Sequence, residues 1–178
     1  RTITNTMALT DLRVFLQELE KEGDLVRVQD RVDRTFEISG HIKKSSDMEG
    51  PALIFENVKD SSMPVLGALY NNRRLMLKAL QTTEECAVED YLRAMQNLAD
   101  PKLVESGPCK EVIRKGDEAS LDDLPIPIFS ALDNAPFITC GVAISKDVDT
   151  GKKNASIYRF EKQGSRQLGV YAPLPHHL

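Results

Sequence analysis

Two short segments near the C-terminal end carry side chains that could do chemistry. The first, 154–159, contains Asn154 and Arg159, and the second contains the pair His176 and His177. A buried amide needs hydrogen-bond partners and a buried guanidinium needs a counter-charge, so both side chains are unusual in an apolar strand. They are therefore candidates for a binding or catalytic site.

Each segment also has an interpretation without chemistry. Asn154 could cap the turn before a strand, with Arg159 pointing to solvent from a sheet edge. The histidine pair could be solvated, since two adjacent histidines are a common accident of sequence. The residues by themselves leave both interpretations open.

The elements that would position these residues form a β-meander. Strands are predicted over 137–145, 154–160 and 167–172, with turns between them. Strict alternation puts Asn154 and Ser156 on one face of a strand, and Ala155, Ile157 and Arg159 on the other. Either the strand carries a bulge or a strong twist here, or a cofactor wraps past the strand end. We predict an irregularity between Asn154 and Arg159.

The chain upstream of the meander predicts a mixed α/β domain. Thr10 is expected to cap a first helix, and Gly23 to end it. Three further helices are expected: 37–44, one capped by Asn71 or Asn72 that runs through Leu80, and one after the capping-box pair Thr82 and Glu85 that ends before Pro101. Strands are expected over 25–28, 52–55 and 65–70.

The last of these helices carries an apolar stripe at helical spacing, which predicts a face packed in the core. Its members are Val88, Tyr91, Leu92, Met95 and Leu98. Alternating prolines in 124–129 predict an extended segment lying on a surface or in a groove. The predicted fold class is α+β: residues 1–6 are upstream or cloning-derived, 7–115 form the mixed domain, and 116–178 open a β domain.

Composition excludes several classes of function. The chain is 41% hydrophobic and 28% charged with a net charge of −4, which gives no reason to expect a nucleic-acid partner. No apolar run is long enough for a membrane span, and the first residues lack the charged-then-apolar pattern expected of a signal peptide. Three widely spaced cysteines fit neither a disulfide framework nor a metal pair, so we expect reduced thiols in a cytoplasmic protein.

Taken together, the two segments resemble the prenylated-FMN site of the UbiD family. The shared pattern is Asn154-x-Ser156-Ile157-x-Arg159, a glycine in the next strand at Gly169, and Pro175-x-His177. The resemblance extends over about residues 8–178 and includes the segments 124–127 and 139–142. UbiD enzymes reversibly decarboxylate aromatic and α,β-unsaturated acids, so it implies a split-barrel-like flavin domain and a carboxylic acid substrate.

The resemblance also implies two metal ions. Asn154 and His177 would help to hold a divalent cation, usually manganese, that bridges to the cofactor phosphate. We favour His177 over His176 as the ligand and place His176 beside the cofactor. An amide oxygen and an imidazole suit such a cation when carboxylate and phosphate oxygens complete the set. A potassium ion near the phosphate would take the backbone carbonyl of Ala155.

The remaining site residues follow from the same resemblance. Arg159 matches the arginine of the family's Glu-Arg-Glu network, where it would bind the substrate carboxylate as a planar fork. It would also tune the acid that protonates the product carbon. Ser156 and Ile157 would contact the flavin, and Thr139 would line the substrate side.

Several parts of the family's site have no counterpart here. The two catalytic glutamates and a carboxylate metal ligand lie further along the chain in the family, and Glu161 is too close to Arg159 to replace them. We therefore expect this chain not to decarboxylate alone, and to form a homo-oligomer or to need a complementing chain. The alternatives are a flavin-binding subunit or an assembly subunit of a carboxylase complex.

Overall fold

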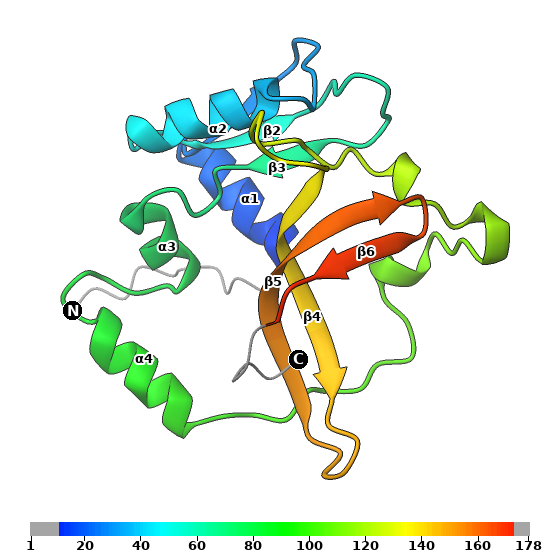
Figure 1. The fold of residues 1–178 in the computed structure, drawn as a ribbon. Helices are drawn as coiled ribbons and strands as arrows, with labels where there is room; N and C mark the ends of the chain where they lie inside the picture. The colour runs from blue at the N-terminus through cyan, green and yellow to red at the C-terminus, as the bar shows by residue number, and fades with distance from the viewer. Residues whose placement is uncertain (1–10, 173–178) are drawn as a thin grey trace. The chain divides into compact units, whose positions relative to one another are not determined.

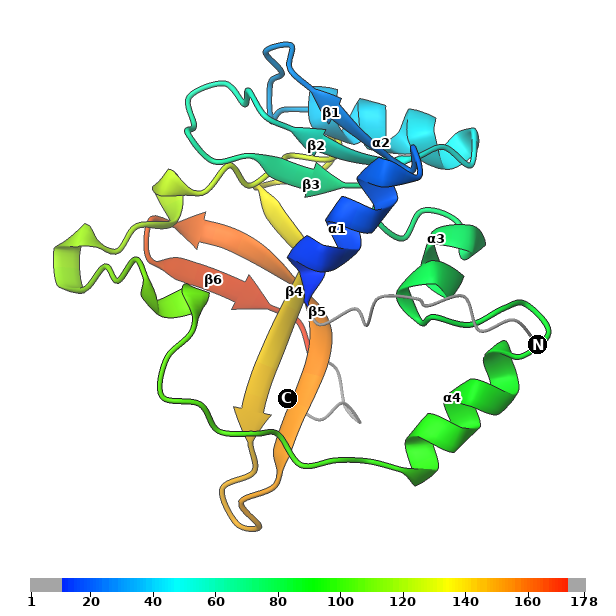
Figure 2. The same cartoon turned by 180° about the vertical axis from the view of Figure 1, so that it is seen from behind.

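A computed structural model of the chain describes residues 11–172 (Figures 1 and 2). Its elements give an α+β fold, as predicted. In chain order they are α1 (Leu12–Lys21), β1 (Leu25–Val28), α2 (Glu37–Asp47), β2 (Ala52–Phe55), β3 (Val65–Gly67), α3 (Arg73–Ala79), α4 (Ala87–Gln96), three single turns of 3-10 helix (Pro108–Lys110, Gly116–Glu118 and Leu121–Asp123), β4 (Phe137–Lys146), β5 (Lys153–Gly164) and β6 (Gln167–Val170).

The described residues divide into two compact units. The first holds residues 11–28, Ile42–Ile54 and Leu66–Ile113, and the second holds Gln29–His41, Phe55–Val65 and residues 114–172. Strands β1, β2 and β3 form one three-stranded sheet, and β4, β5 and β6 form another. Among the helices described, none is both long and apolar enough to cross a membrane.

The core of the first unit lies between α1, the first sheet and α3. Its buried members are Phe15, Leu19, Leu25, Ala52 and Leu75. The expected cap at Thr10 lies outside the described residues, and the N-cap is Asp11, whose carboxylate accepts the Val14 N–H at 3.1 Å. Gly23 follows the helix with a φ of +78°, as its position predicted.

A polar cluster ties α3 to the loop before β1. The side chain of Asp24 is only 12% exposed and pairs with both Arg74 and Lys78. The hydrogen bond from Arg74, followed by that from Lys78, holds the pKa of Asp24 below its ordinary value. The N-cap of α3 is Asn72, which accepts the Leu75 N–H at 3.0 Å.

Two predictions about local structure are wrong. The strand expected over 65–70 ends at Gly67, because Ala68 has a φ of +54° and leaves the β conformation. Helix α4 begins at Ala87 without a side-chain cap. Thr82, expected to cap it, instead donates its hydroxyl hydrogen bond to Asp90 at 2.6 Å.

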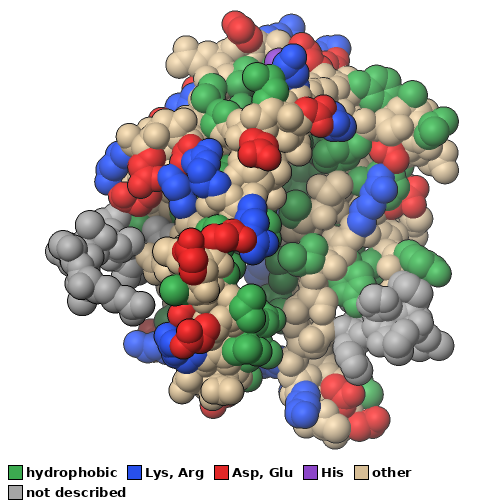
Figure 3. Space-filling view, turned by 90° about the vertical axis from the view of Figure 1, so that its left-hand side faces the viewer, with side chains coloured by type: hydrophobic (Ala, Val, Ile, Leu, Met, Phe, Trp, Pro, Cys, Tyr) green, Lys and Arg blue, Asp and Glu red, His purple; other side chains and the backbone are tan. Residues whose placement is uncertain are grey.

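The apolar stripe of α4 is not packed in a core, contrary to the prediction. The helix has no buried residue. The stripe residues are between 52% and 79% exposed. Figure 3 views the side on which α3 and α4 lie and shows hydrophobic side chains at the surface among charged ones. Periodicity identified the apolar face correctly, but nothing in the described residues covers it.

The extended segment 124–129 lies within the second unit. Ile128 accepts the Phe36 N–H at 3.0 Å and donates to the Arg34 carbonyl at 3.1 Å. Ile126 is buried, as are Val32, Ile38, Phe55 and Val58 of the same unit. The prediction of an extended segment is confirmed, and pairing with 34–36 holds it in place.

The meander is antiparallel throughout, with β5 in the centre. Strand β4 pairs with β5 from Phe137 opposite Glu161 to Lys146 opposite Lys153. Strand β6 pairs only with Phe160–Gly164 of β5. The β4–β5 hairpin therefore extends beyond the end of β6 as a two-stranded ribbon (Figures 1 and 2).

Candidate functional site

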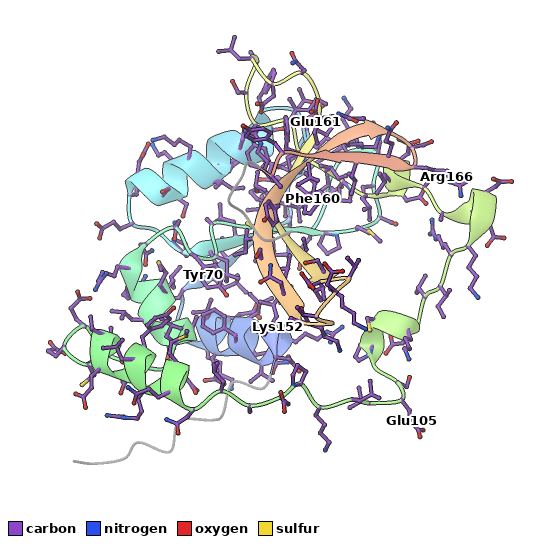
Figure 4. All side chains as sticks on the ribbon, turned by 60° about the horizontal axis from the view of Figure 1, so that its bottom comes forward. Tyr70, Glu105, Lys152, Phe160, Glu161 and Arg166 are labelled. Atoms are coloured by element: carbon purple, nitrogen blue, oxygen red, sulfur yellow. The ribbon has the colours of Figure 1, made fainter. Side chains whose placement is uncertain are left out.

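The predicted site residues of β5 lie on the two faces of the ribbon. Asn154 and Ser156 are on the partly buried face, whereas Ala155, Ile157 and Arg159 are exposed. The Asn154 amide nitrogen donates to the Ser156 hydroxyl at 2.8 Å, which orients the amide along the strand. Lys152 and Phe160, labelled in Figure 4, mark the two ends of this stretch. The alternation is the one that a regular strand predicts.

The predicted irregularity does not lie within β5. The ladder with β4 is regular from Lys153 to Tyr158, and the register shifts between Ile138 and Gly141 of β4. Two residues of β4, Thr139 and Cys140, thus stand opposite the single residue Arg159, which is the arrangement of a β-bulge. The irregularity predicted between Asn154 and Arg159 is thus absent from 154–158, and the bulge that stands opposite Arg159 belongs to β4.

Arg159 is half-exposed but does not simply point into solvent. One terminal nitrogen of its guanidinium donates to the Asp133 carboxylate at 2.9 Å. Its central carbon lies 3.7 Å from the centre of the Phe137 ring. This is a cation–π stack, which adds attraction to the ion pair. The amino-acid pattern alone did not identify Asp133 and Phe137 as contacts of Arg159.

The turn of the hairpin fixes where β5 begins. The Asp147 side chain accepts the backbone N–H of Asp149 at 3.1 Å and that of Thr150 at 2.6 Å. It also accepts the Thr150 hydroxyl at 2.7 Å. These hydrogen bonds, first of all the backbone one from Thr150, lower the pKa of Asp147. An ionised Asp147 thus stabilises the turn that precedes Asn154.

Near Arg159, the backbone of Gly141 in β4 lies close to the Phe160 ring of β5. A Cβ atom on Gly141 would lie 2.5 Å and 2.6 Å from two atoms of the Phe160 ring. Only glycine therefore lets Phe160 sit against β4 at this point. At Gly169 the nearest atoms belong to the flexible end of Gln163, so the constraint there is weaker.

The other predicted site residues are not brought to this point. Thr139 is exposed in the bulge of β4. His176 and His177 lie outside the described residues. Within residues 11–172, no group of three or more His, Cys, Asp or Glu side chains could hold a metal ion.

A surface pocket of about 510 Å³ is lined by none of the predicted site residues. It is lined by Leu121, Leu124 and Leu168 and by two arginines, Arg114 and Arg166. Arg166 pairs with Asp117 at 3.0 Å, and Arg114 pairs with Asp123. Both guanidiniums thus already have acidic partners, and the pocket contains none of the predicted site residues.

Comparisons with known proteins decide the family. Residues 16–95 match the 3-octaprenyl-4-hydroxybenzoate carboxy-lyase N-terminal domain. Residues 102–178 match the 3-octaprenyl-4-hydroxybenzoate carboxy-lyase Rift-related domain. The chain belongs to the UbiD family. All predicted site residues of this UbiD chain fall within the second match.

Solved UbiD-class structures share the fold. The enzyme HmfF from Pelotomaculum thermopropionicum in complex with FMN is 35% identical, with a TM-score of 0.86 over 93% of this chain. An evolved dimeric form of HmfF in complex with prFMN matches equally well, at 35% identity and 0.86. Vanillic acid decarboxylase from Sedimentibacter hydroxybenzoicus, in an open form, is 26% identical with a TM-score of 0.82 over 90% of this chain.

The matched enzymes are much longer than this chain. It spans 37% of the HmfF chain in the FMN complex, 38% of the evolved dimeric form and 36% of the vanillic acid decarboxylase chain. This UbiD chain thus corresponds to about a third of each.

Proposed function

We propose that this chain contributes to an enzyme that reversibly decarboxylates aromatic or α,β-unsaturated carboxylic acids with prenylated FMN. The match of residues 102–178 to the carboxy-lyase Rift-related domain carries the proposal, because that range contains the whole Asn-x-Ser-Ile-x-Arg element. The two HmfF complexes, with FMN and with prFMN, support the cofactor. Bound prenylated FMN would act as the electron sink of the reaction.

A cofactor bound along the edge of β5 could contact side chains from both faces of the strand. The described ladder with β6 begins only at Phe160, so the β6-side edge of 153–158 lies outside it. A cofactor lying along that edge would reach Asn154 and Ser156 on one face, and Ile157 and Arg159 on the other. His176 is proposed as a further cofactor contact. The edge position removes the need for a bulge inside β5.

We propose that Asn154 and His177 are ligands of Mn²⁺, and that the Ala155 backbone carbonyl is a ligand of K⁺. The donor types fit, since amide and carbonyl oxygens and imidazole suit such ions. The Asn154 amide nitrogen is used by Ser156 at 2.8 Å, which directs the amide oxygen away from that bond. A third, carboxylate ligand for Mn²⁺ would come from outside this chain's matched residues.

Arg159 is proposed as the catalytic residue of this chain, with Thr139 on the substrate side. A guanidinium presents a planar fork that matches a carboxylate in a bidentate way. Thr139 stands opposite Arg159 in the bulge, so both residues belong to one short stretch of the ladder. Together they would orient the substrate acid beside the cofactor.

The complete enzyme would need more than this chain. We propose a homo-oligomer or a complementing chain that supplies the missing glutamates, and a domain boundary near residue 115. Three free cysteines support a reducing, cytoplasmic setting. The exposed stripe of α4 supports, as the second candidate function, an assembly or flavin-binding subunit that docks onto another chain.

The test is the metal and flavin content of the complete enzyme that contains this chain, purified from cells that make prenylated FMN. We expect bound flavin in the absorbance spectrum and manganese by mass spectrometry. Asn154→Ala should lose the manganese, whereas Asn134→Ala, which removes an exposed amide of the same unit, should retain it. Equal manganese in both variants would contradict the ligand assignment.

A further inference from the structure

We propose that Asp133 and Phe137 hold the Arg159 guanidinium in its working orientation, which makes Asp133 a positioning residue of this site. The inference rests on the proposed function, in which Arg159 binds the substrate carboxylate. Asp133 accepts from one terminal nitrogen of Arg159 at 2.9 Å, and the Phe137 ring lies 3.7 Å from the guanidinium carbon. The carboxylate holds one terminal nitrogen of the guanidinium, and the ring lies over one of its faces.

Asp133 differs from the other ion-paired aspartates of its unit. Its side chain is 16% exposed, whereas those of Asp33, Asp123, Asp122, Asp60 and Asp117 are between 36% and 107% exposed. An exposed ion pair between long side chains keeps much of its rotamer freedom and contributes little. A carboxylate that is mostly shielded from water restrains its partner more strongly.

Asp133 is itself held in place by its own turn. Its second carboxylate oxygen accepts the Ser130 N–H at 3.1 Å. Its backbone N–H donates to the Ser130 carbonyl at 3.0 Å. Phe137 is likewise anchored, because its N–H donates to the Pro127 carbonyl at 3.0 Å. The Asp133 carboxylate and the backbone of Phe137 are therefore each held by a hydrogen bond to the main chain.

The arrangement leaves Arg159 able to bind an acid. A guanidinium has five N–H donors, and the hydrogen bond to Asp133 comes from one terminal nitrogen. Since Phe137 stacks on a face, a substrate carboxylate would approach in the plane, at an edge that Asp133 does not occupy. Asp133 also offsets part of the positive charge of the Arg159 guanidinium. This weakens the attraction for an acid bound at its other N–H groups and favours release of that acid.

The first measurement needs neither flavin nor substrate. In the ¹⁵N-labelled chain, the Arg159 Nε–Hε signal is assigned by its loss in Arg159→Lys. We expect restricted rotation of this guanidinium in the wild type and averaged signals in Asp133→Asn. Asp117→Asn removes the exposed partner of Arg166 in the same unit and should leave the Arg159 signal unchanged. A restricted Arg159 in Asp133→Asn overturns the proposal.

The second measurement uses the complete enzyme loaded with prenylated FMN, with 4-hydroxybenzoate and cinnamate as probe acids. Asp133→Asn should lower kcat/KM by about 10- to 100-fold, the range expected when a catalytic group loses its alignment. Asp133→Glu should recover part of the loss, and Asp117→Asn should stay within about twofold of the wild type. The urea midpoint of Asp133→Asn should stay close to that of the wild type, because the asparagine keeps an oxygen that can accept the Ser130 N–H, and Arg159 remains half in water.

The outcomes separate this proposal from the proposed function. If Arg159→Lys abolishes turnover while Asp133→Asn keeps it, the positioning role is wrong and the proposed function stands. If Arg159→Lys keeps full turnover, or the loaded wild type turns over neither acid, the proposed function fails and the positioning role fails with it. Loss of turnover in Asp133→Asn with a lowered urea midpoint would also overturn the proposal, because it indicates a structural role.

Discussion

The two three-stranded sheets of this chain differ sharply in how they are covered. The first sheet contributes buried residues from each strand, including Leu25 of β1, Ala52 and Phe55 of β2, and Gly67 of β3. In the second sheet, β4, β5 and β6 contain no buried residue within the described chain. Val142, Ile144 and Ile157 are 59%, 78% and 73% exposed on one face of its ribbon.

The difference shows which part of the molecule is organised by its own core. Burial of apolar side chains supplies most of the stability of a sheet, and an isolated two-stranded ribbon is only marginally stable. The first sheet has that burial within the chain. The ribbon carries the predicted cofactor residues on strands that bury no residue within the described chain.

The largest expected effect comes from the covered sheet. Phe55 is fully buried in β2, so Phe55→Ala should lower the free energy of unfolding by about 3–5 kcal/mol through lost burial and a cavity. Val142→Ala on the ribbon should cost less than about 1 kcal/mol. Urea titration measures both. A loss in Val142→Ala as large as that in Phe55→Ala would mean that the ribbon face is buried in solution.

A smaller effect is expected at the polar cluster of the first unit. Asp24→Asn should lower the free energy of unfolding at pH 7 by about 2 kcal/mol, because Arg74 and Lys78 lose their shared carboxylate. The matched control is Asp47→Asn, whose partner Lys43 lies on the exposed side of α2. Unfolding curves in which both variants lose equal stability would contradict a special role for Asp24.

The same residue predicts a pH dependence. The pKa of Asp24 is lower in the folded chain than its ordinary value of 3.8, so the folded state binds fewer protons near that pH. The stabilisation is therefore present above pH 3.8 and is lost as the pH falls through the lowered pKa. Stability measured from pH 7 down to acid should fall less in Asp24→Asn than in the wild type. Parallel curves would rule out this contribution.

The ribbon has one position where a small change should matter. Gly141→Ala places a Cβ against the Phe160 ring, and we expect a loss of about 1 kcal/mol, the lower end of the overpacking range, because the half-exposed ring can shift. Gly169→Ala meets only the flexible end of Gln163 and should cost less. Urea midpoints that rank these two variants in reverse would show that the ring contact is not formed.

The smallest effect is expected on the exposed face of the ribbon. Ile144→Thr keeps a β-branched side chain and removes apolar surface that is 78% exposed, so the free energy of unfolding should change by less than about 0.5 kcal/mol. Its solubility limit should rise, since exposed apolar patches promote association. A loss above about 1 kcal/mol in the unfolding titration would place Ile144 in a core that this chain forms on its own.

Local signals were enough to predict much of the fold. The strands 25–28 and 52–55 have the bounds that were predicted, because each is a short apolar run next to a helix end or a Gly-Pro turn. The positive φ of Gly23 and the cap at Asn72 also depend on neighbouring residues alone. The positive φ of Ala68, which shortens β3, has no comparable signal, since only glycine favours that conformation.

Contacts between distant segments were harder to predict. The stripe of α4 was identified, but periodicity says which residues share a face and not what covers it. The strand period puts Asn154 and Arg159 on opposite faces, and the irregularity that we predicted between them is absent from 154–158, because the bulge depends on the pairing with β4. Asp133 lies 26 residues from Arg159 in sequence, so their ion pair is visible only in the folded chain.

The turn at the end of the β4–β5 ribbon is a suitable place to attach a spin label. Val148 is 95% exposed, and the Asp147 hydrogen bonds hold the turn without using its side chain. A spin label at this position would sit beyond the last rung of the ladder, where small rocking of the two strands is amplified. Its mobility would report directly whether the ribbon becomes rigid when flavin, metal or a second chain arrives.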